Sequence, residues 1–114
     1  MQRDFANFPD DDNGDVLWRM HQHGDDLSKP REVDFSVIFP TSQAALDFAL
    51  HLLKNGQKVS FGPYEGNADL PWQVEAHPVL LPNHSSITEY ENRLARDAKL
   101  HGGRNDGWGS MQQD

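Results

Sequence analysis

The sequence predicts a small α+β domain in which helices cover one face of an antiparallel sheet. Some segments alternate apolar with polar residues, as half-buried strands do, and they are interspersed with segments whose apolar residues recur every three or four positions, as in helices. A length of 114 residues with 36% hydrophobic content suits one modest core. We therefore expect an irregular acidic leader over residues 1–12 and a single domain over residues 13–112.

The first predicted element is a short helix over residues 15–23. Its apolar side chains are one and four positions apart, which places them on one side of a helix. Asn13 or Asp15 can cap the start, and Gly24 can end the helix.

Residues 31–41 alternate as a strand that is buried on one face. The inward residues are Val33, Phe35, Val37 and Phe39, and the outward ones are Asp34, Ser36 and Ile38. Pro40 ends this strand, and Thr41 or Ser42 can cap a helix that stops at Asn55-Gly56. The apolar stripe of that helix is Ala45, Phe48, Ala49, Leu52 and Leu53.

The second half of the chain repeats this pattern. Residues 58–63 read as a strand, a polar turn follows, and residues 72–77 alternate again until Pro78 ends the strand or makes a bulge. Ser86-Ile-Thr-Glu89 is a capping box at the start of a third helix, which closes at Gly102-Gly103. Residues 104–111, which contain Trp108, are needed to complete the sheet.

Two right-handed strand-helix-strand units joined by a hairpin give the ferredoxin-like βαββαβ sandwich. We expect a four-stranded antiparallel sheet in the order fourth, first, third, second, with the two long helices on one face. The short N-terminal helix precedes this unit, and we expect it to cover part of the open face, because Leu17 and Trp18 need an apolar surface.

Composition excludes several classes of function. The net charge of −8 repels phosphate backbones, so direct nucleic-acid binding is disfavoured. The outward positions of the sheet also carry acids such as Asp34 and Glu75, where an RNA-binding sheet of this type would present aromatic rings. The absence of cysteine and of any long apolar run predicts a cytoplasmic chain without disulfides or a membrane segment.

No pattern predicts catalysis, a cofactor or a metal. His21 and His23 are two apart on the predicted helix and point away from each other, so they cannot share one ion. The run from Asp10 to Gly14 fails as a calcium loop, because Pro9 would stand at the first ligand position and Met20 at the bidentate glutamate. No nucleophile elbow is present.

Several segments are similar to the family of the regulator of ribonuclease E activity B (RraB), and the similarity spans about residues 13–112. They are Asp15-Val-Leu-Trp18, Lys29 to Phe35, the apolar helix after Pro40, and Asp106-Gly-Trp-Gly109. The resemblance implies a ferredoxin-like fold. It also implies a protein that acts without catalysis, by binding the non-catalytic scaffold region of ribonuclease E and lowering its cleavage of messenger RNA.

The resemblance implies arginine-rich scaffold segments as the partner, and an acidic protein suits them by complementary charge. We therefore predict a contact surface from the N-terminal aspartates and one aromatic residue. The predicted partner-binding residues are Asp10, Asp11, Asp12, Asp15, Asp25, Asp26 and Trp108. Trp108 is read first as a core or strand-end anchor and alternatively as an exposed contact. A second hypothesis is a ferredoxin-like interaction or oligomerisation module that pairs through its sheet, at Ile38 or Trp108, with an unrelated partner. The oligomeric state is left open.

Overall fold

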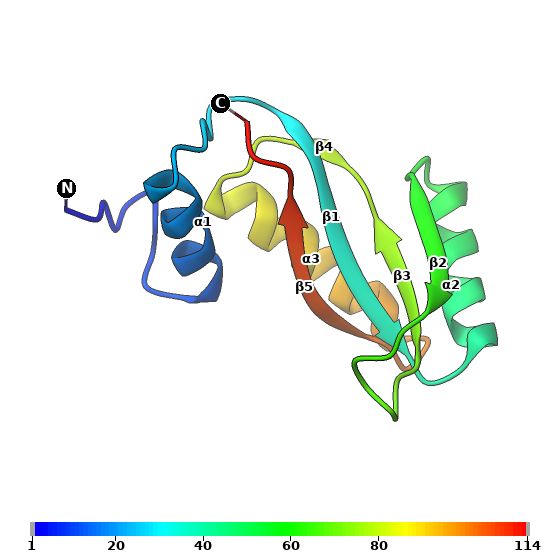
Figure 1. Cartoon of the computed structure of the whole chain (residues 1–114). Coiled ribbons are helices and arrows are strands. Elements are labelled where there is room, and N and C mark those ends of the chain that lie inside the picture. The colour runs from blue at the N-terminus through cyan, green and yellow to red at the C-terminus, as the bar shows by residue number, and fades with distance from the viewer. Residues whose placement is uncertain (1, 114) are drawn as a thin grey trace.

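Three helices and five strands alternate along the chain in the computed structural model, which describes residues 2–113 (Figure 1). The order agrees with the α+β class that the periodicity predicts. The elements are α1 (Asp12–Gln22), β1 (Arg31–Phe39), α2 (Ser42–Lys54), β2 (Val59–Pro63), β3 (Trp72–Ala76), β4 (Val79–Leu80), α3 (His84–Lys99) and β5 (Arg104–Ser110).

The five strands form one antiparallel sheet around β1, which pairs with β3 on one side and with β5 on the other. The predicted number of four strands is wrong, because the short β4 also pairs with the start of β1. β2 pairs with β3 and lies at the sheet margin. Phe35 is opposite Ala76, and four residues earlier Arg31 is opposite Leu80, so β3 and β4 follow one register along β1. Pro78 separates them, as the sequence predicts, and its carbonyl still accepts from the Val33 amide at 2.9 Å.

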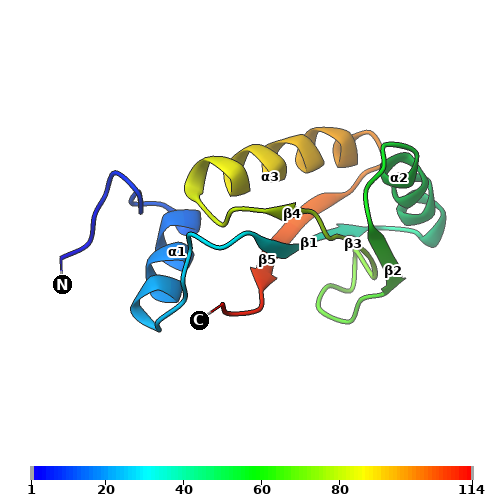
Figure 2. The ribbon, with the colours of Figure 1, turned by 90° about the horizontal axis from the view of Figure 1, so that it is seen from above.

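Helices α2 and α3 lie on one face of the sheet (Figure 2). The inward side chains of β1 meet the apolar stripes of both helices, and this contact forms the core. The prediction that Leu53 belongs to the α2 stripe is wrong, because its side chain is exposed on the outer side of the helix. Its largest fully buried side chains include Phe35, Phe39 and Phe48. Phe39 and Phe48 pack with their ring centroids 5.1 Å apart, which joins β1 to α2. No helix among residues 2–113 is long and apolar enough to cross a membrane.

Two helices start at other residues than the sequence indicates. The side chain of Asp11 accepts from the Gly14 amide at 2.8 Å, so α1 begins at Asp12. The side chain of Asn83 accepts from the Ser86 amide at 2.9 Å and makes Asn83 the N-cap of α3. The predicted capping box at Ser86 is therefore wrong, because the chain is already helical from His84 and the asparagine caps its first turn.

The prediction that Ile38 lies on an exposed face is wrong, because Ile38 is fully buried. Its neighbours in the sheet are Gln73 on β3 and Arg104 on β5. The Tyr64 hydroxyl, just after β2, donates to the Asp106 carboxylate on β5, and this contact spans β3 and β1. The β2–β3 loop therefore closes over this end of the open face, as Figure 1 shows.

Helix α1 stands beside the β5 margin and contacts α3 (Figures 1 and 2). The expectation that it covers the open face is therefore wrong. Leu17 is buried, and Trp18 packs against Phe8 of the preceding segment with ring centroids 5.3 Å apart. The leader, and not the sheet, therefore supplies the apolar contact of Trp18.

Candidate protein-interaction site

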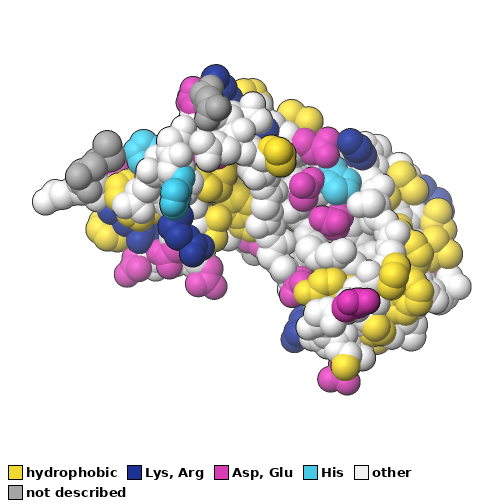
Figure 3. Space-filling model, in the orientation of Figure 1, with side chains coloured by type: hydrophobic (Ala, Val, Ile, Leu, Met, Phe, Trp, Pro, Cys, Tyr) yellow, Lys and Arg dark blue, Asp and Glu magenta, His cyan; other side chains and the backbone are white. Residues whose placement is uncertain are grey.

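Four of the predicted aspartates gather at the start of α1. Asp10, Asp11, Asp12 and Asp15 are all exposed. Acidic side chains lie along one edge of this end of the molecule in Figure 3, and others lie over the sheet. Asp15 is held by Arg3, whose Nη2 lies 2.8 Å from Asp15 Oδ1. The N-terminus of α1 carries the positive end of the helix dipole, which stabilises carboxylates at this position.

Asp11 is the most strongly held of the four. It accepts from the Gly14 amide, and its Oδ2 lies 2.7 Å from His84 Nε2 at the start of α3. These two hydrogen bonds, the backbone one first, lower the pKa of the Asp11 carboxyl below its ordinary value. Asp11 therefore keeps its negative charge to lower pH than a free aspartate.

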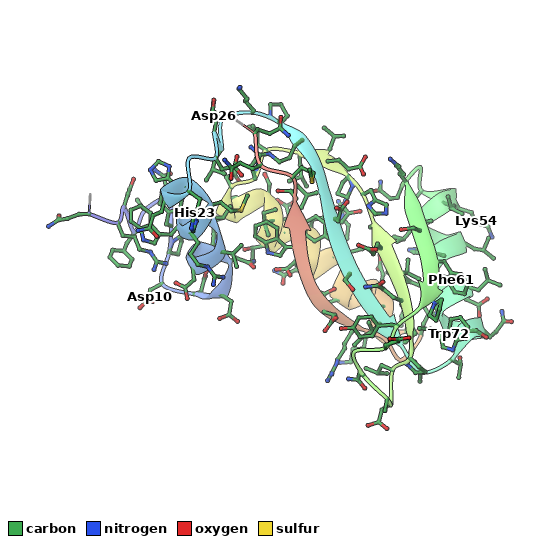
Figure 4. All side chains as sticks on the ribbon, in the orientation of Figure 1. Asp10, His23, Asp26, Lys54, Phe61 and Trp72 are labelled. Atoms are coloured by element: carbon green, nitrogen blue, oxygen red, sulfur yellow. The ribbon has the colours of Figure 1, made fainter. Side chains whose placement is uncertain are left out.

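The remaining two aspartates do not join this group. Asp25 is buried and receives a bidentate contact from Arg31 Nη1, at 2.8 Å to each carboxylate oxygen. It is closed to a partner in this structure, contrary to its assignment as a contact residue. Asp26 lies near the opposite end of α1 from Asp10, as their labels in Figure 4 show. Its carboxylate accepts from the Ser28 hydroxyl and from the Ser28 amide, and these hydrogen bonds, the hydroxyl one first, lower the pKa of Asp26.

Trp108 joins α1 to the sheet. It lies opposite Phe35 on β5 and is half-buried, with its ring packed against the core. Its indole Nε1 donates to Asn13 Oδ1 at 3.0 Å. Asn13 Nδ2 in turn donates to Thr88 Oγ1 at 3.1 Å and to Glu91 Oε1 at 2.7 Å on α3. Asn13 thus connects α1, α3 and β5. The sequence gives no sign of this role, because an asparagine at this position is equally typical of a helix cap.

A shallow hollow opens where these three elements meet. Its lining includes Asp11 before α1, Asp12 from α1, Glu91 from α3, and Trp108 from β5. We call these four residues the acidic hollow. Three of them were predicted as contact residues from the sequence, and the structure brings these three together although 96 residues separate Asp12 from Trp108. Glu91 was not predicted as a contact residue, because it is one of several polar residues on α3 and nothing in the sequence distinguishes it.

The acidic hollow combines three carboxylates with the side chain of Trp108 in one lining. This combination suits a guanidinium group, which binds carboxylates through its planar set of donors and stacks on aromatic rings. The histidines of α1 do not form a site beside it. His21 stacks on Trp18 at 5.7 Å, whereas His23 Nδ1 lies 2.6 Å from the Arg19 carbonyl.

The fold and this surface define a small α+β domain with an acidic surface at one end of its sheet. Residues 10–110 match the family model described as regulator of ribonuclease activity B, which covers most of the 114 residues. The chain belongs to this family of ribonuclease regulators. No curated protein matches the chain significantly.

Proposed function

We propose that this domain binds a ribonuclease E-type endoribonuclease at its non-catalytic scaffold region and lowers cleavage of RNA without catalysing a reaction itself. The observation that carries the proposal is the acidic hollow, in which Asp11, Asp12 and Trp108 meet. Membership of a family of ribonuclease regulators supplies the class of partner. We also infer that the fold is ferredoxin-like, which is supported by β1 lying between β3 and β5 under two helices.

The charge of the domain supports a basic partner segment. The net charge is −8, and Asp10, Asp12 and Asp15 extend the acidic surface beyond the hollow. Long-range attraction would speed the encounter, and contacts with the hollow would fix the position of the segment. Such a partner acts on messenger RNA, which accords with the cytoplasmic location that the sequence predicts.

Calorimetry with the purified non-catalytic half of the endoribonuclease from the same source tests the proposal. We expect binding in the micromolar range or tighter, weakened by raising salt from low to physiological concentration. A variant with Asp10, Asp11 and Asp12 all changed to Asn should weaken binding at least tenfold. Asn at position 11 keeps a cap for α1, so the variant changes charge more than structure.

A matched control removes three other exposed acids far from α1. Asp47→Asn, Glu65→Gln and Asp69→Asn together change the net charge by the same amount. This control should bind nearly as tightly as the natural chain. Equal weakening in both variants would show that only net charge matters and would overturn the assignment of the contact to α1. No binding heat at either salt concentration would reject the ribonuclease partner.

A second candidate is an oligomerisation module, and exposed apolar residues at the β2 margin favour it. Phe61 is 44% exposed on β2, and Leu46, Leu50 and Leu53 on α2 are 42%, 45% and 52% exposed. Ile38 is buried, so self-association would use this margin instead of the sheet face. Sedimentation of the natural chain and of Phe61→Ser distinguishes the candidates. A dimer that withstands salt and is lost in Phe61→Ser supports the module.

A further inference from the structure

A second group of titratable side chains lies on the open face of the sheet, away from the acidic hollow. Glu32 and Asp34 are two apart on β1 and therefore share a face. His77 comes directly after β3, the strand that pairs with β1. Its amide donates to the carbonyl of Lys58, which comes directly before β2. Figure 3 shows a histidine surrounded by acidic side chains and one basic side chain on this face.

The three side chains converge on one point. His77 Nδ1 lies 2.6 Å from Asp34 Oδ1 and 3.8 Å from Glu32 Oε1. One ligand atom from each residue lies within 4.8 Å of the others. Zinc binds imidazole nitrogen and carboxylate oxygen at about 2.0–2.2 Å, which places ligand atoms roughly 3–3.6 Å apart around the ion. Small rotations of the Glu32 and Asp34 side chains would bring the ligand atoms to these separations. Both side chains have room to rotate, because each is 43% exposed.

Ser60 holds the other side of the imidazole. Its Oγ lies 2.7 Å from His77 Nε2, and the His77 side chain is only 13% exposed. In the metal-free chain Nδ1 donates to the Asp34 carboxylate 2.6 Å away. A cation would displace that proton, and Nε2 would then donate to Ser60 while the Nδ1 lone pair faces the ion. Metal-binding histidines in proteins are oriented in this way by a hydrogen bond from the second ring nitrogen.

The positive charge of Lys58 disfavours a cation between Glu32, Asp34 and His77. Its ammonium lies 2.9 Å from Glu32 Oε2 and satisfies part of the carboxylate charge. The Lys58 side chain is 69% exposed, so it can turn into solvent when an ion enters. Its positive charge would still repel the ion and reduce the metal affinity. A variant that removes this charge, Lys58→Gln, should therefore bind the metal more tightly.

We propose that Glu32, Asp34 and His77 form a binding site for a divalent transition-metal cation, with zinc as the best match to one imidazole and two carboxylates. The ion would link β1 to the end of β3, at the interruption between β3 and β4 where Pro78 lies. The site is independent of the acidic hollow and does not require the proposed ribonuclease partner.

Calorimetric titration of the untagged full chain with zinc chloride tests the site. We expect one equivalent of zinc to bind at micromolar concentration or tighter. His77→Ala and Asp34→Asn should each weaken that equivalent at least tenfold, and Lys58→Gln should tighten it about two- to tenfold. Asp34→Asn nearly preserves size, so it remains informative if His77→Ala fails to fold.

His84→Ala is the matched control, because His84 is also a partly exposed histidine, paired with the single carboxylate of Asp11. It should leave the zinc affinity within twofold of the natural chain. Absence of zinc binding at millimolar concentration would overturn the proposal. So would equal losses in His77→Ala and His84→Ala, because adventitious binding to surface histidines gives that result.

Thermal unfolding supplies a readout independent of binding heat. Zinc that binds the folded chain raises Tm as its concentration exceeds the Kd. The rise should be present in the natural chain, larger in Lys58→Gln and lost in Asp34→Asn. A Tm rise that persists in Asp34→Asn would contradict the site.

Discussion

Asn13 accepts a hydrogen bond from the indole of Trp108, and the two residues lie 95 positions apart in the chain. The same amide donates to Thr88 and Glu91 on α3. One asparagine therefore fixes α1 against both α3 and β5. The acidic hollow depends on these hydrogen bonds, because Asp11 and Asp12 line one hollow with Trp108 only when α1 packs beside α3 and β5.

Asn13→Ala should destabilise the domain, since it removes three side-chain hydrogen bonds. We expect a loss of about 1–3 kcal/mol in the free energy of unfolding, measured with urea. Trp108 should also become more accessible to a fluorescence quencher. Asn7→Ala is the control, because the Asn7 side chain donates to Asp4 within an exposed turn. Equal stability of both variants would contradict the docking role of Asn13.

The elements that periodicity governs could be predicted from the sequence. The alternation in β1 and the stripe of α2 correctly place Val33, Phe35 and Phe48 in the core. Asp25 shows where this reasoning fails, because an aspartate reads as a surface residue until its partner is known. Arg31, the first residue of β1, supplies that partner through folding of the intervening segment.

The acidic hollow could be predicted only in part. Charge and the aromatic residue near the end of the chain identified Asp11, Asp12 and Trp108. Their proximity depends on α1 standing beside β5, which is a long-range contact that local pattern does not specify. Ile38 was misplaced for a similar reason, because its burial depends on long-range packing that the strand alternation does not specify.

The buried pair Asp25 and Arg31 makes a second prediction about stability. Asp25→Ala should cost about 3–5 kcal/mol, since it leaves the Arg31 guanidinium buried without its counter-charge. Arg31 also donates to the Asp26 carbonyl at 2.8 Å, and Asp25 accepts from the Gln113 amide at 3.1 Å. The pair therefore fastens the C-terminal residues to the segment before β1.

The double variant Asp25→Ala with Arg31→Met should regain part of this loss, because it removes both charges and keeps the aliphatic stem. Urea unfolding of the two single variants and the double variant measures the coupling. Asp26→Ala is the control and should cost less, because its carboxylate is bonded to Ser28 near the surface. Additive effects of the two single substitutions would rule out coupling between Asp25 and Arg31.

The contact between Tyr64 and Asp106 predicts a pH dependence. The hydrogen bond that the Tyr64 hydroxyl donates to the Asp106 carboxylate raises the pKa of Tyr64 above its ordinary value. Folding thus favours the protonated phenol. The stabilisation is fully present below the pKa of the unfolded chain and is lost as pH rises through the higher pKa of the folded state.

Asp106→Asn should lower the pKa of Tyr64 towards its ordinary value, because it removes the charged acceptor. The measurement is the ultraviolet absorbance of tyrosinate against pH in a Tyr90→Phe background, in which Tyr64 is the one remaining tyrosine of the two in the sequence. Tyr90 is the internal control in the unmodified chain, since its pKa is raised by burial and should not respond to Asp106→Asn. A Tyr64 pKa that Asp106→Asn leaves unchanged would show that the loop does not hold this contact across the sheet.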